Sequence, residues 1–285
     1  MTVLEAIQKS TEFLGKKNVE SPRLQTELLL AHLLKLPRMK LYLNFERVLT
    51  PAETGALRES VKRRGQREPL QHITGSTSFC GHEIAVNRHV LIPRPETELL
   101  AELGWQFLAT CNPQPGTCLD LCTGSGCIAI AIAAKCPPAK ISATDISADA
   151  LALAKENAAR NKVAERIQFL QSDGFAALSA GTQFDLIVSN PPYIPSSEIE
   201  TLAPEVRDFD PRLALDGGAD GLFFYRKLAP EAKAFLKPGG KIIVEFGDGQ
   251  ADAIKEIFAD EKWIVEAVKE DYSQRARILI ASLNR

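Results

Sequence analysis

The sequence has few of the residues that hold metals, and none in a metal-binding pattern. It contains four histidines, the last of them His89, and six cysteines without the paired CxxC spacing of a zinc site. No stretch approaches the roughly 18 apolar residues of a membrane span, and residues 1–13 lack the charged-then-apolar layout of a signal peptide. We therefore expect no metal site, reduced thiols and a cytoplasmic protein.

A large net charge is also missing, which argues against a polyanion as the partner of the whole molecule. The formal net charge is −2 over 285 residues. The charge is uneven, however, because residues 1–75 carry 13 Lys and Arg against 8 Asp and Glu, whereas residues 76–285 carry 21 against 28. This asymmetry predicts two domains with different roles, and the chain is long enough for two modest cores.

The amino-terminal part shows only helical patterns. Ser21 and Thr50 each precede a proline, so each places a capping hydroxyl directly before the first helical position. Glu53 completes a capping box with Thr50. We expect a small helical domain over residues 1–73. Its basic run at 62–67 fits a solvated helix face better than a specific docking patch.

The rest of the chain predicts an α/β fold. Short alternating segments at 77–92 indicate a β-hairpin linker over residues 74–95, and strands then alternate with helices from 96 to 285. The expected strands are 117–122, 140–145, 166–172, 184–189, 241–246, 263–269 and 277–283, and the expected helices are 96–109, 128–135, 147–160 and 222–235. The last two strands leave no room for a crossover helix, so they should pair as an antiparallel hairpin. The result is a seven-stranded doubly wound sheet.

A glycine-rich loop follows the first of these strands. Glycines let backbone N–H groups approach a ligand at a helix start, and Asp145 ends the next strand 21 residues after Gly124, where a carboxylate can hold ribose hydroxyls. The pattern predicts a site for a nucleoside-bearing cofactor, and the alternative is a tight turn with a surface aspartate. The candidate cofactor-binding residues of this part are Cys122, Thr123, Gly124, Ser125, Gly126 and Asp145.

Residues 190–193, Asn-Pro-Pro-Tyr, end a strand of buried character. Two prolines cannot donate to a sheet ladder, so the strand must stop there in a stiff turn. The turn offers the side chain of Asn190, free backbone carbonyls and the ring of Tyr193. Two acceptors and a ring suit a planar –NH2 group. The alternative is a proline-rich loop with Tyr193 packed below it.

These residues should meet in one crevice, because ligands of open α/β sheets bind beyond the carboxyl ends of the strands. Asp173 could accept from an adenine amine and Phe175 could pack beside the ring, unless this segment is a turn with a core phenylalanine. The glycine spacing, with Ala129, also fits NAD. We favour S-adenosylmethionine, because a reversed terminal hairpin is foreign to the dinucleotide fold.

Several segments carry a resemblance to a known family. Residues 119–130, Asp145 and 185–193 look like class I methyltransferases that methylate planar nitrogens. With segments 92–98 and 205–218 and the helical domain added, nearly the whole chain resembles the release factor glutamine methyltransferase (HemK/PrmC) family. The resemblance implies methyl transfer from S-adenosylmethionine to the side-chain amide of the Gly-Gly-Gln glutamine of class-1 peptide-chain release factors.

The resemblance also implies residue roles. Asn190 and the Pro191 carbonyl would accept the two amide hydrogens while Tyr193 stacks on the amide plane, which makes these three the catalytic residues. The implied cofactor contacts are Cys122 to Gly126, Asp145, Gly174 and Asn190, and the implied substrate contacts are Asn190, Pro191, Pro192 and Tyr193. Two residues depart from the family pattern: Cys122 replaces a usual glycine, and Gly174 stands where some members have an aromatic residue.

Three alternatives stay open. One is methylation of a ribosomal-protein glutamine by a sister branch with the same catalytic motifs. Another is methylation of an adenine or guanine amine in nucleic acid, although the acidic catalytic half and the lack of a basic, aromatic-rich domain argue against it. The third is a binding protein that keeps the fold as a scaffold. We expect a monomer without membrane or nucleic-acid partners. No role for Arg94 follows from the sequence.

Overall fold

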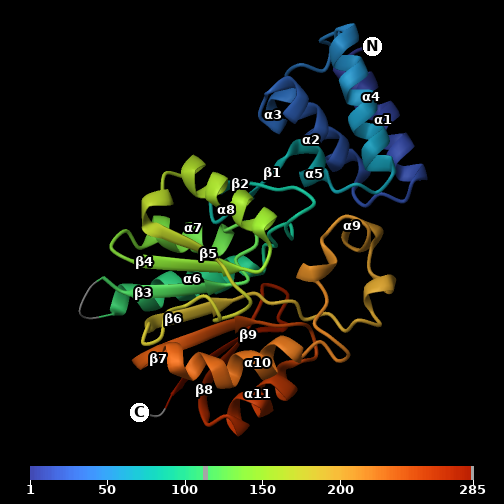
Figure 1. Cartoon of the computed structure of the whole chain (residues 1–285). Coiled ribbons are helices and arrows are strands. Elements are labelled where there is room, and N and C mark those ends of the chain that lie inside the picture. Colours follow the sequence, from blue (N-terminus) through green and yellow to red (C-terminus); the bar gives the residue numbers. More distant parts are fainter. Residues whose placement is uncertain (112–114, 284–285) are drawn as a thin grey trace. The chain divides into compact units, whose positions relative to one another are not determined.

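The computed structural model, which describes residues 1–111 and 115–283, divides the chain into two compact units (Figure 1). The first consists of Met1–Ser76 together with Ala203–Phe209, and the second of Thr77–Leu202 together with Asp210–Arg285. The segment Ala203–Phe209 therefore belongs to the helical unit, although it comes after the fourth strand of the sheet. No helix among the described residues is long and apolar enough to cross a membrane.

The first unit is a bundle of helices around a core of leucines. Its helices are α1 (Val3–Lys16), α2 (Pro22–Leu34), α3 (Arg38–Leu41), α4 (Pro51–Gly65), α5 (Leu70–Thr74) and α9 (Pro204–Arg207). The predicted capping box at α4 is confirmed, because the Thr50 side chain accepts from the Glu53 amide and the Glu53 side chain accepts from the Thr50 amide. The predicted cap at Ser21 is wrong. Ser21 has a left-handed backbone with φ of 46°, and its side chain makes no capping hydrogen bond, although α2 does begin at Pro22.

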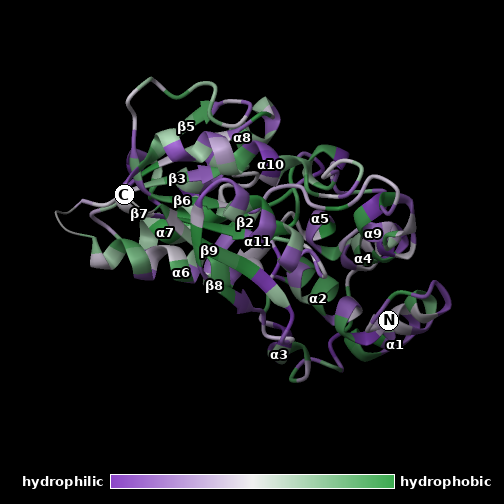
Figure 2. Ribbon diagram, turned by 90° about the horizontal axis from the view of Figure 1, so that it is seen from below, coloured by the Kyte–Doolittle hydropathy of each residue, from purple (hydrophilic) through white to green (hydrophobic). Residues whose placement is uncertain are grey.

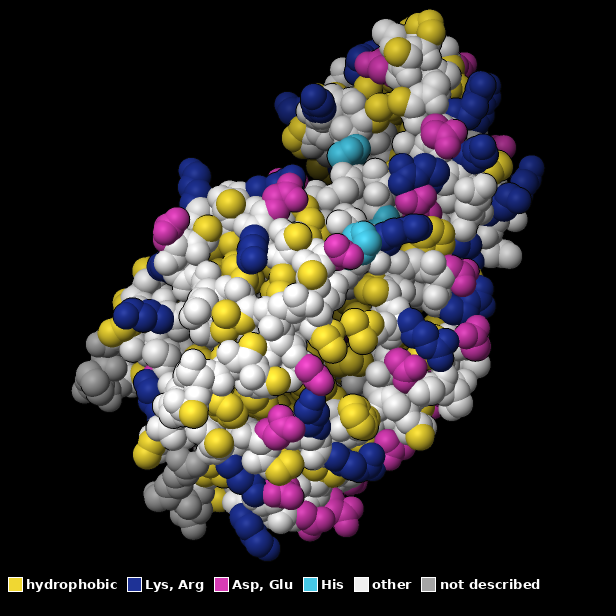
Figure 3. Space-filling model, viewed as in Figure 1, with side chains coloured by type: hydrophobic (Ala, Val, Ile, Leu, Met, Phe, Trp, Pro, Cys, Tyr) yellow, Lys and Arg dark blue, Asp and Glu magenta, His cyan; other side chains and the backbone are white. Residues whose placement is uncertain are grey.

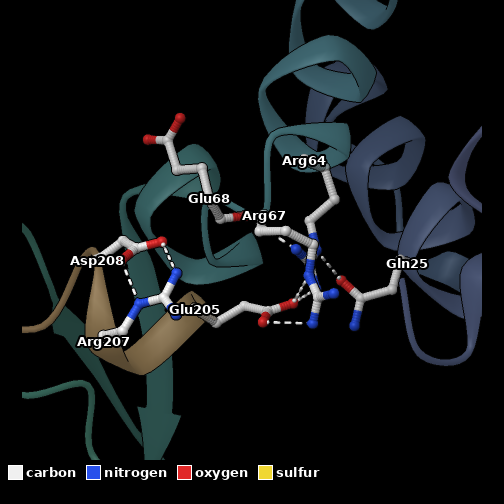
Figure 4. A network of polar contacts seen from close by, with 7 residues as sticks. All are labelled: Gln25, Arg64, Arg67, Glu68, Glu205, Arg207 and Asp208. Atoms are coloured by element: carbon white, nitrogen blue, oxygen red, sulfur yellow. Dashed lines mark hydrogen bonds and ion pairs between the residues drawn. The ribbon is translucent and has the colours of Figure 1, made fainter. Parts of the chain in front are cut away.

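Part of the basic run at 62–67 is buried by an ion-pair network (Figure 4). Glu205 accepts from Arg64 at 2.8 Å and from two nitrogens of Arg67 at 2.6 and 2.7 Å. Arg64 also donates to the side chain of Gln25 and to the backbone carbonyl of Glu68. The prediction that the whole run is a solvated helix face is therefore wrong at Arg64, because α9 brings a carboxylate that the local pattern does not reveal.

The second unit contains the predicted seven-stranded sheet, with strand order β5-β4-β3-β6-β7-β9-β8. Neighbouring strands from β5 to β7 are parallel, whereas β9 runs antiparallel to both β7 and β8. The strands are β3 (Thr117–Leu121), β4 (Lys140–Asp145), β5 (Ile167–Gln171), β6 (Phe184–Ser189), β7 (Leu236–Glu245), β8 (Trp263–Glu270) and β9 (Ala276–Leu283). This arrangement confirms the predicted fold class.

Helices cover both faces of the sheet because alternate strand residues point to opposite sides. Leu186 and Val188 pack in the core under α6 (Thr97–Thr110), α7 (Cys127–Lys135) and α8 (Ala148–Arg160), whereas Ile187 packs in the core under α10 (Phe223–Glu231) and α11 (Ala251–Asp260). Figure 2 shows α7 and β9 as largely hydrophobic. Short 3₁₀ turns complete the chain at Ala164–Arg166, Ile199–Thr201, Arg212–Ala214 and Ala232–Phe235.

Helix α11 is the one sizeable element that the sequence patterns did not predict. The register makes β8 parallel to β7, since both are antiparallel to β9. A parallel connection needs a crossover, and α11 supplies it. Ile254 and Phe258, one helical turn apart, are both fully buried, so the helical spacing was present in the sequence.

A two-stranded hairpin begins the second unit. It consists of β1 (Ser76–Phe79) and β2 (His82–Ala85), joined by a turn in which Cys80 and Gly81 both have positive φ. The buried side chain of Asn157 on α8 accepts from the Ala85 amide at 2.8 Å and donates to the Ala85 carbonyl at 3.0 Å. The same side chain also donates to the Ser125 carbonyl at 2.9 Å, so it ties the hairpin to the glycine-rich loop.

Candidate active site

A cavity of about 450 Å³ lies beyond the carboxyl ends of the parallel strands in the second unit. Its volume is within the range of small-molecule sites. Most of the predicted site residues line it, namely Cys122, Thr123, Gly124, Ser125, Asp145, Asp173, Gly174, Asn190 and Pro192. The predicted residues Gly126, Phe175, Pro191 and Tyr193 are not among its lining.

Asp145 holds the glycine-rich loop in place. One carboxylate oxygen accepts from the Gly124 amide at 2.8 Å and the other accepts from the Ser147 amide at 2.9 Å. Burial raises the pKa of Asp145 above its ordinary value, although these amide donors act in the opposite direction. The carboxylate thus faces the cavity with its orientation set by two backbone bonds.

Three residues of the loop, Cys122, Gly124 and Gly126, adopt a left-handed backbone. Gly126 caps α7 with φ of 81°, and a Cβ there would lie 3.1 Å from the side chain of Ala154, so this glycine serves close packing of helices. Cys122 has φ of 59°, a region that residues with a Cβ rarely adopt. The backbone of Cys122, which lines the cavity, is therefore strained, because the residue has a Cβ.

Asp120 is a buried carboxyl beneath this loop. One oxygen accepts from the Thr123 hydroxyl at 2.6 Å and from the Ala129 amide at 3.1 Å, while its other oxygen has no partner among the described residues. Burial raises the pKa of Asp120 to about 7. It was not among the predicted site residues, and its place at the end of β3 is the signal that could have found it.

The segment after β5 contributes less to the cavity than expected. Asp173 lines it but is exposed and forms an ion pair with Lys227 at 2.7 Å. Phe175 is 4% exposed and stacks on Phe235 with ring centroids 4.8 Å apart. The ring of Phe175 therefore belongs to the core, which is the structural alternative that the sequence left open.

The Asn-Pro-Pro-Tyr turn presents two acceptors. The side-chain nitrogen of Asn190 donates to the Thr97 hydroxyl at 3.2 Å, which leaves Oδ1 for a ligand. The Pro191 carbonyl accepts no hydrogen bond from the donors of the described residues. Tyr193 is largely buried, and burial raises its pKa to about 12, so it remains a neutral phenol.

The turn is supported from the segment that resembled the family at 205–218. The Ile194 amide donates to the Leu215 carbonyl at 2.9 Å, and the Ile194 carbonyl accepts from the Gly217 amide at 2.8 Å. A Cβ on Gly217 would lie 2.8 Å from the Cα of Tyr193, so only glycine fits there. Asp216 accepts from the Ser196 hydroxyl at 2.5 Å and from the Gly218 amide at 3.0 Å. This segment thus sets the backbone beside the turn.

Three further residues with polar side chains come from the linker, from α6 and from β7. Arg94 lines the cavity and donates to buried Asp210 at 2.8 Å, and burial raises the pKa of Asp210 to about 6. Thr97, at the start of α6, lines the cavity next to Asn190. Glu245, the last residue of β7, is 2% exposed, and burial raises its pKa to about 7. Thr97 and Glu245 were not predicted as site residues.

Family models match both units. A PrmC N-terminal domain matches residues 5–75, and a methyltransferase small domain matches residues 101–205.

Within the described residues no group of three or more His, Cys, Asp or Glu could hold a metal ion, and the six cysteines are free thiols.

Relatives match almost the entire chain. A release factor glutamine methyltransferase of Geobacter sulfurreducens is 44% identical over 258 residues, which cover 90% of this chain and 88% of that protein. A release factor glutamine methyltransferase of Moorella thermoacetica is 40% identical over 282 residues, covering 99% and 98%. Among solved structures, a T. thermophilus 16S rRNA N2 G1207 methyltransferase in complex with AdoMet and guanosine has a TM-score of 0.52 at 18% identity, covering 73% of this chain and 50% of that one. That likeness concerns the fold.

Proposed function

Because the chain belongs to the release factor glutamine methyltransferase family, we propose that it transfers a methyl group from S-adenosylmethionine to the side-chain amide nitrogen of the glutamine in the Gly-Gly-Gln motif of class-1 release factors. The substrate would bind at Asn190, Pro191, Pro192 and Tyr193. Such a substrate would place the activity in the cytoplasm, where translation ends.

The observation that carries this proposal is the pair of unpaired acceptors in the turn. The side-chain nitrogen of Asn190 donates to Thr97, so Oδ1 remains available to a substrate. The Pro191 carbonyl has no partner among the described donors. A primary amide has two hydrogens in one plane, and two acceptors at adjacent residues can take both. The same turn has no charged group that would bind a carboxylate or a phosphate instead.

The chemistry requires alignment more than activation. An amide nitrogen is a poor nucleophile because its lone pair is delocalised into the carbonyl. Acceptors that hold both hydrogens would turn the lone pair towards the methyl group, and they bind more strongly as positive charge grows on the nitrogen. S-adenosylmethionine would supply a methyl group that its sulfonium already activates. Tyr193, as a neutral ring, would stack on the amide plane.

The cavity fits the cofactor in two respects. Gly124 has φ of 54° and no atom within 4 Å of an added Cβ, so the loop is open to a ligand at the start of α7. Asp145 faces the same cavity with both oxygens held, where it would accept from ribose hydroxyls. Four further lining residues would contact the cofactor, namely Cys122, Thr123, Ser125 and Gly174. Asp173 would contact it only if its ion pair with Lys227 broke.

An amine of a nucleic-acid base would satisfy the same two acceptors. On the face shown in Figure 3, however, basic and acidic side chains are interspersed over both units, without the continuous basic stripe that a phosphate backbone requires. A protein substrate is therefore favoured, and we propose that the basic helical domain over residues 1–73 recognises it.

The substrate class can be tested with purified components. The protein is incubated with methyl-labelled S-adenosylmethionine in separate reactions, each with one candidate substrate. The candidates are a class-1 release factor, an unmethylated ribosomal protein of the kind that carries a methylated glutamine, and duplex and single-stranded nucleic acid. We expect label in the release factor alone. Label in the ribosomal protein or in nucleic acid would replace the proposed substrate with that alternative.

A further inference from the structure

Phe223 is an exposed aromatic residue in the lining of the cavity. It begins α10 and is 67% exposed, whereas Phe224, the other phenylalanine of the described lining, is partly buried against the core. A large ring that remains mostly in water gains free energy when it packs against a flat apolar group. The proposed cofactor, S-adenosylmethionine, carries one such group, the adenine base.

The order of the strands indicates which part of the cavity would take that base. Asp145 ends β4, which lies between β5 and β3, and β6 lies on the far side of β3. In the proposed function Asp145 accepts from the ribose, and the methyl group must reach Asn190 after β6. The base and the sulfonium are attached to opposite sides of the ribose. The base would therefore extend the other way, towards Asp173 and Gly174, which follow β5.

Helix α10 contacts the segment after β5 one helical turn beyond Phe223. Lys227 pairs with Asp173 at 2.7 Å, and the Cε and Nζ atoms of Lys227 would lie 3.7 Å from a Cβ on Gly174. Residues four positions apart in a helix lie on the same face, so Phe223 and Lys227 are neighbours on α10. Phe223 thus lines the cavity from the face of α10 that adjoins the expected place of the base.

The main chain of Phe223 is held by the segment that also supports the turn. Its amide donates to the Gly217 carbonyl at 3.1 Å, and a Cβ on Gly218 would lie 3.1 Å from the Cβ of Phe223. Ile146, directly after Asp145, also lines the cavity and is 48% exposed. A planar base is therefore offered exposed apolar side chains by two separate segments of the chain.

We propose that Phe223 binds the adenine base of S-adenosylmethionine by packing its ring on the base. This is the role that the sequence pattern predicted for Phe175, which instead stacks on Phe235 in the core. The inference rests on the proposed function for the identity of the cofactor. Phe223 contacts the base only, and the methyl acceptor remains with the Asn-Pro-Pro-Tyr turn.

Calorimetric titration with S-adenosylhomocysteine, the demethylated cofactor, tests the contact without turnover. Phe223→Ala should weaken binding roughly tenfold, which is within the range for loss of an aromatic side chain from a stacked base. Phe223→Tyr keeps the ring and should bind as wild type does. Phe223→Leu keeps apolar bulk without a flat face, so its affinity should lie between those of Phe223→Ala and wild type.

Tyr272→Ala is the matched control. Tyr272 is 74% exposed and lies between β8 and β9, outside the lining of the cavity, so its loss should leave the affinity for S-adenosylhomocysteine unchanged. Thermal unfolding of each variant shows that it is folded.

A ligand without the base separates this contact from any other. S-ribosylhomocysteine keeps the ribose and the amino-acid part of S-adenosylhomocysteine but has no adenine. If the ring packs on the base, Phe223→Ala and wild type should bind S-ribosylhomocysteine equally well. An equal loss of affinity for both ligands would show that Phe223 acts on another part of the cofactor or on the fold, and would overturn the proposal.

Phe223→Trp supplies an optical readout of the same contact. After subtraction of the wild-type signal, which comes from Trp105 and Trp263, the fluorescence of the new indole should be quenched by S-adenosylhomocysteine and unchanged by S-ribosylhomocysteine. An unchanged cofactor affinity of Phe223→Ala with a raised Michaelis constant for the release factor would overturn the proposal and assign Phe223 to the protein substrate. Cofactor binding with the expected ratios, but without methyl transfer to the release factor, would refute the proposed function and leave this contact standing.

Discussion

Glu205 and Arg64 form an ion pair inside one compact unit although 141 residues separate them in the sequence. The carboxylate comes from α9, which follows the Asn-Pro-Pro-Tyr turn in the chain, and both of its oxygens are held by Arg64 and Arg67. The segment that resembled the family at 205–218 therefore has two roles: its first residues complete the helical unit, and its last residues support the turn.

This pair predicts a pH-dependent contribution to stability. Burial raises the pKa of Glu205, but hydrogen bonds from Arg67 and Arg64 outweigh it and lower the pKa from 4.5 to about 2. Because the folded value is depressed, the stabilisation is complete above about pH 4.5 and is lost as the pH falls towards 2. It amounts to at most about 3 kcal/mol.

Urea unfolding of wild type and Glu205→Gln at pH 7 and pH 3 checks this contribution. The variant should be less stable at pH 7, and the difference should shrink at pH 3. Glu200→Gln is the control, because Glu200 pairs with Arg212 at 3.5 Å between two exposed side chains and should change stability little. A Glu205→Gln deficit of equal size at both pH values would contradict the account.

Asp145→Ala should weaken binding of S-adenosylmethionine more than tenfold. Two hydrogen bonds from ribose hydroxyls to a charged acceptor would be lost, and the Gly124 amide would lose its partner. Asp145→Asn keeps one acceptor oxygen, so its affinity for the cofactor should lie between those of wild type and Asp145→Ala. Calorimetric titration with the cofactor measures all three, and an unchanged affinity of Asp145→Ala would remove this residue from the cofactor site.

The strained backbone at Cys122 predicts that a substitution by glycine stabilises the fold relative to a substitution by alanine. Its φ of 59° costs a residue with a Cβ roughly 1 kcal/mol that glycine does not incur. Cys122→Gly should therefore be more stable than Cys122→Ala by about this amount, although both remove the thiol. Thermal unfolding compares the two, and an alanine variant as stable as the glycine variant would show that the backbone is not strained.

Recognition of the protein substrate by the helical domain can be tested on the full chain. Deletion of residues 1–73 would also take both arginines from Glu205, so neutralisation of exposed charges is cleaner. Lys9→Gln, Arg58→Gln and Lys62→Gln, combined, change residues that line one shallow cavity of this unit. The Michaelis constant for the release factor should rise while cofactor affinity stays constant, and an unchanged Michaelis constant would give the domain another role.

The sheet could be predicted from the sequence because each strand carried its own signal. The run ending at Ser189 is apolar and β-branched, and the Asn190 turn ends it by proline chemistry, which is local. The reversed strand followed from the short connection between β8 and β9. Helix α11 was not predicted, although the parallel register of β8 requires it.

The parts of the site that escaped prediction depend on contacts between distant residues. Thr97 meets Asn190 across 93 positions, and neither the linker motif nor the turn reveals the other. Glu245 ends a strand that should carry apolar residues at its buried positions, so its burial is visible only in three dimensions. Phe175 and Ser21 were predicted to have roles that the structure does not give them. Phe175 was expected beside an adenine ring but stacks on Phe235 in the core, and Ser21 was expected to cap α2 but makes no capping hydrogen bond.

The most direct measurement of the central claim is single-turnover methyl transfer by Asn190→Ala to a release factor with an intact Gly-Gly-Gln glutamine. The substitution removes one of two acceptors in a site that should exclude water, and the lost bond strengthens as charge develops on the nitrogen. We predict a loss of roughly a hundredfold or more in rate with a smaller change in substrate affinity. Asn190→Asp, which keeps an acceptor oxygen, should retain more activity. Equal rates for Asn190→Ala and wild type, or equal labelling of a release factor whose glutamine is replaced by alanine, would contradict the claim that this turn holds the methyl acceptor.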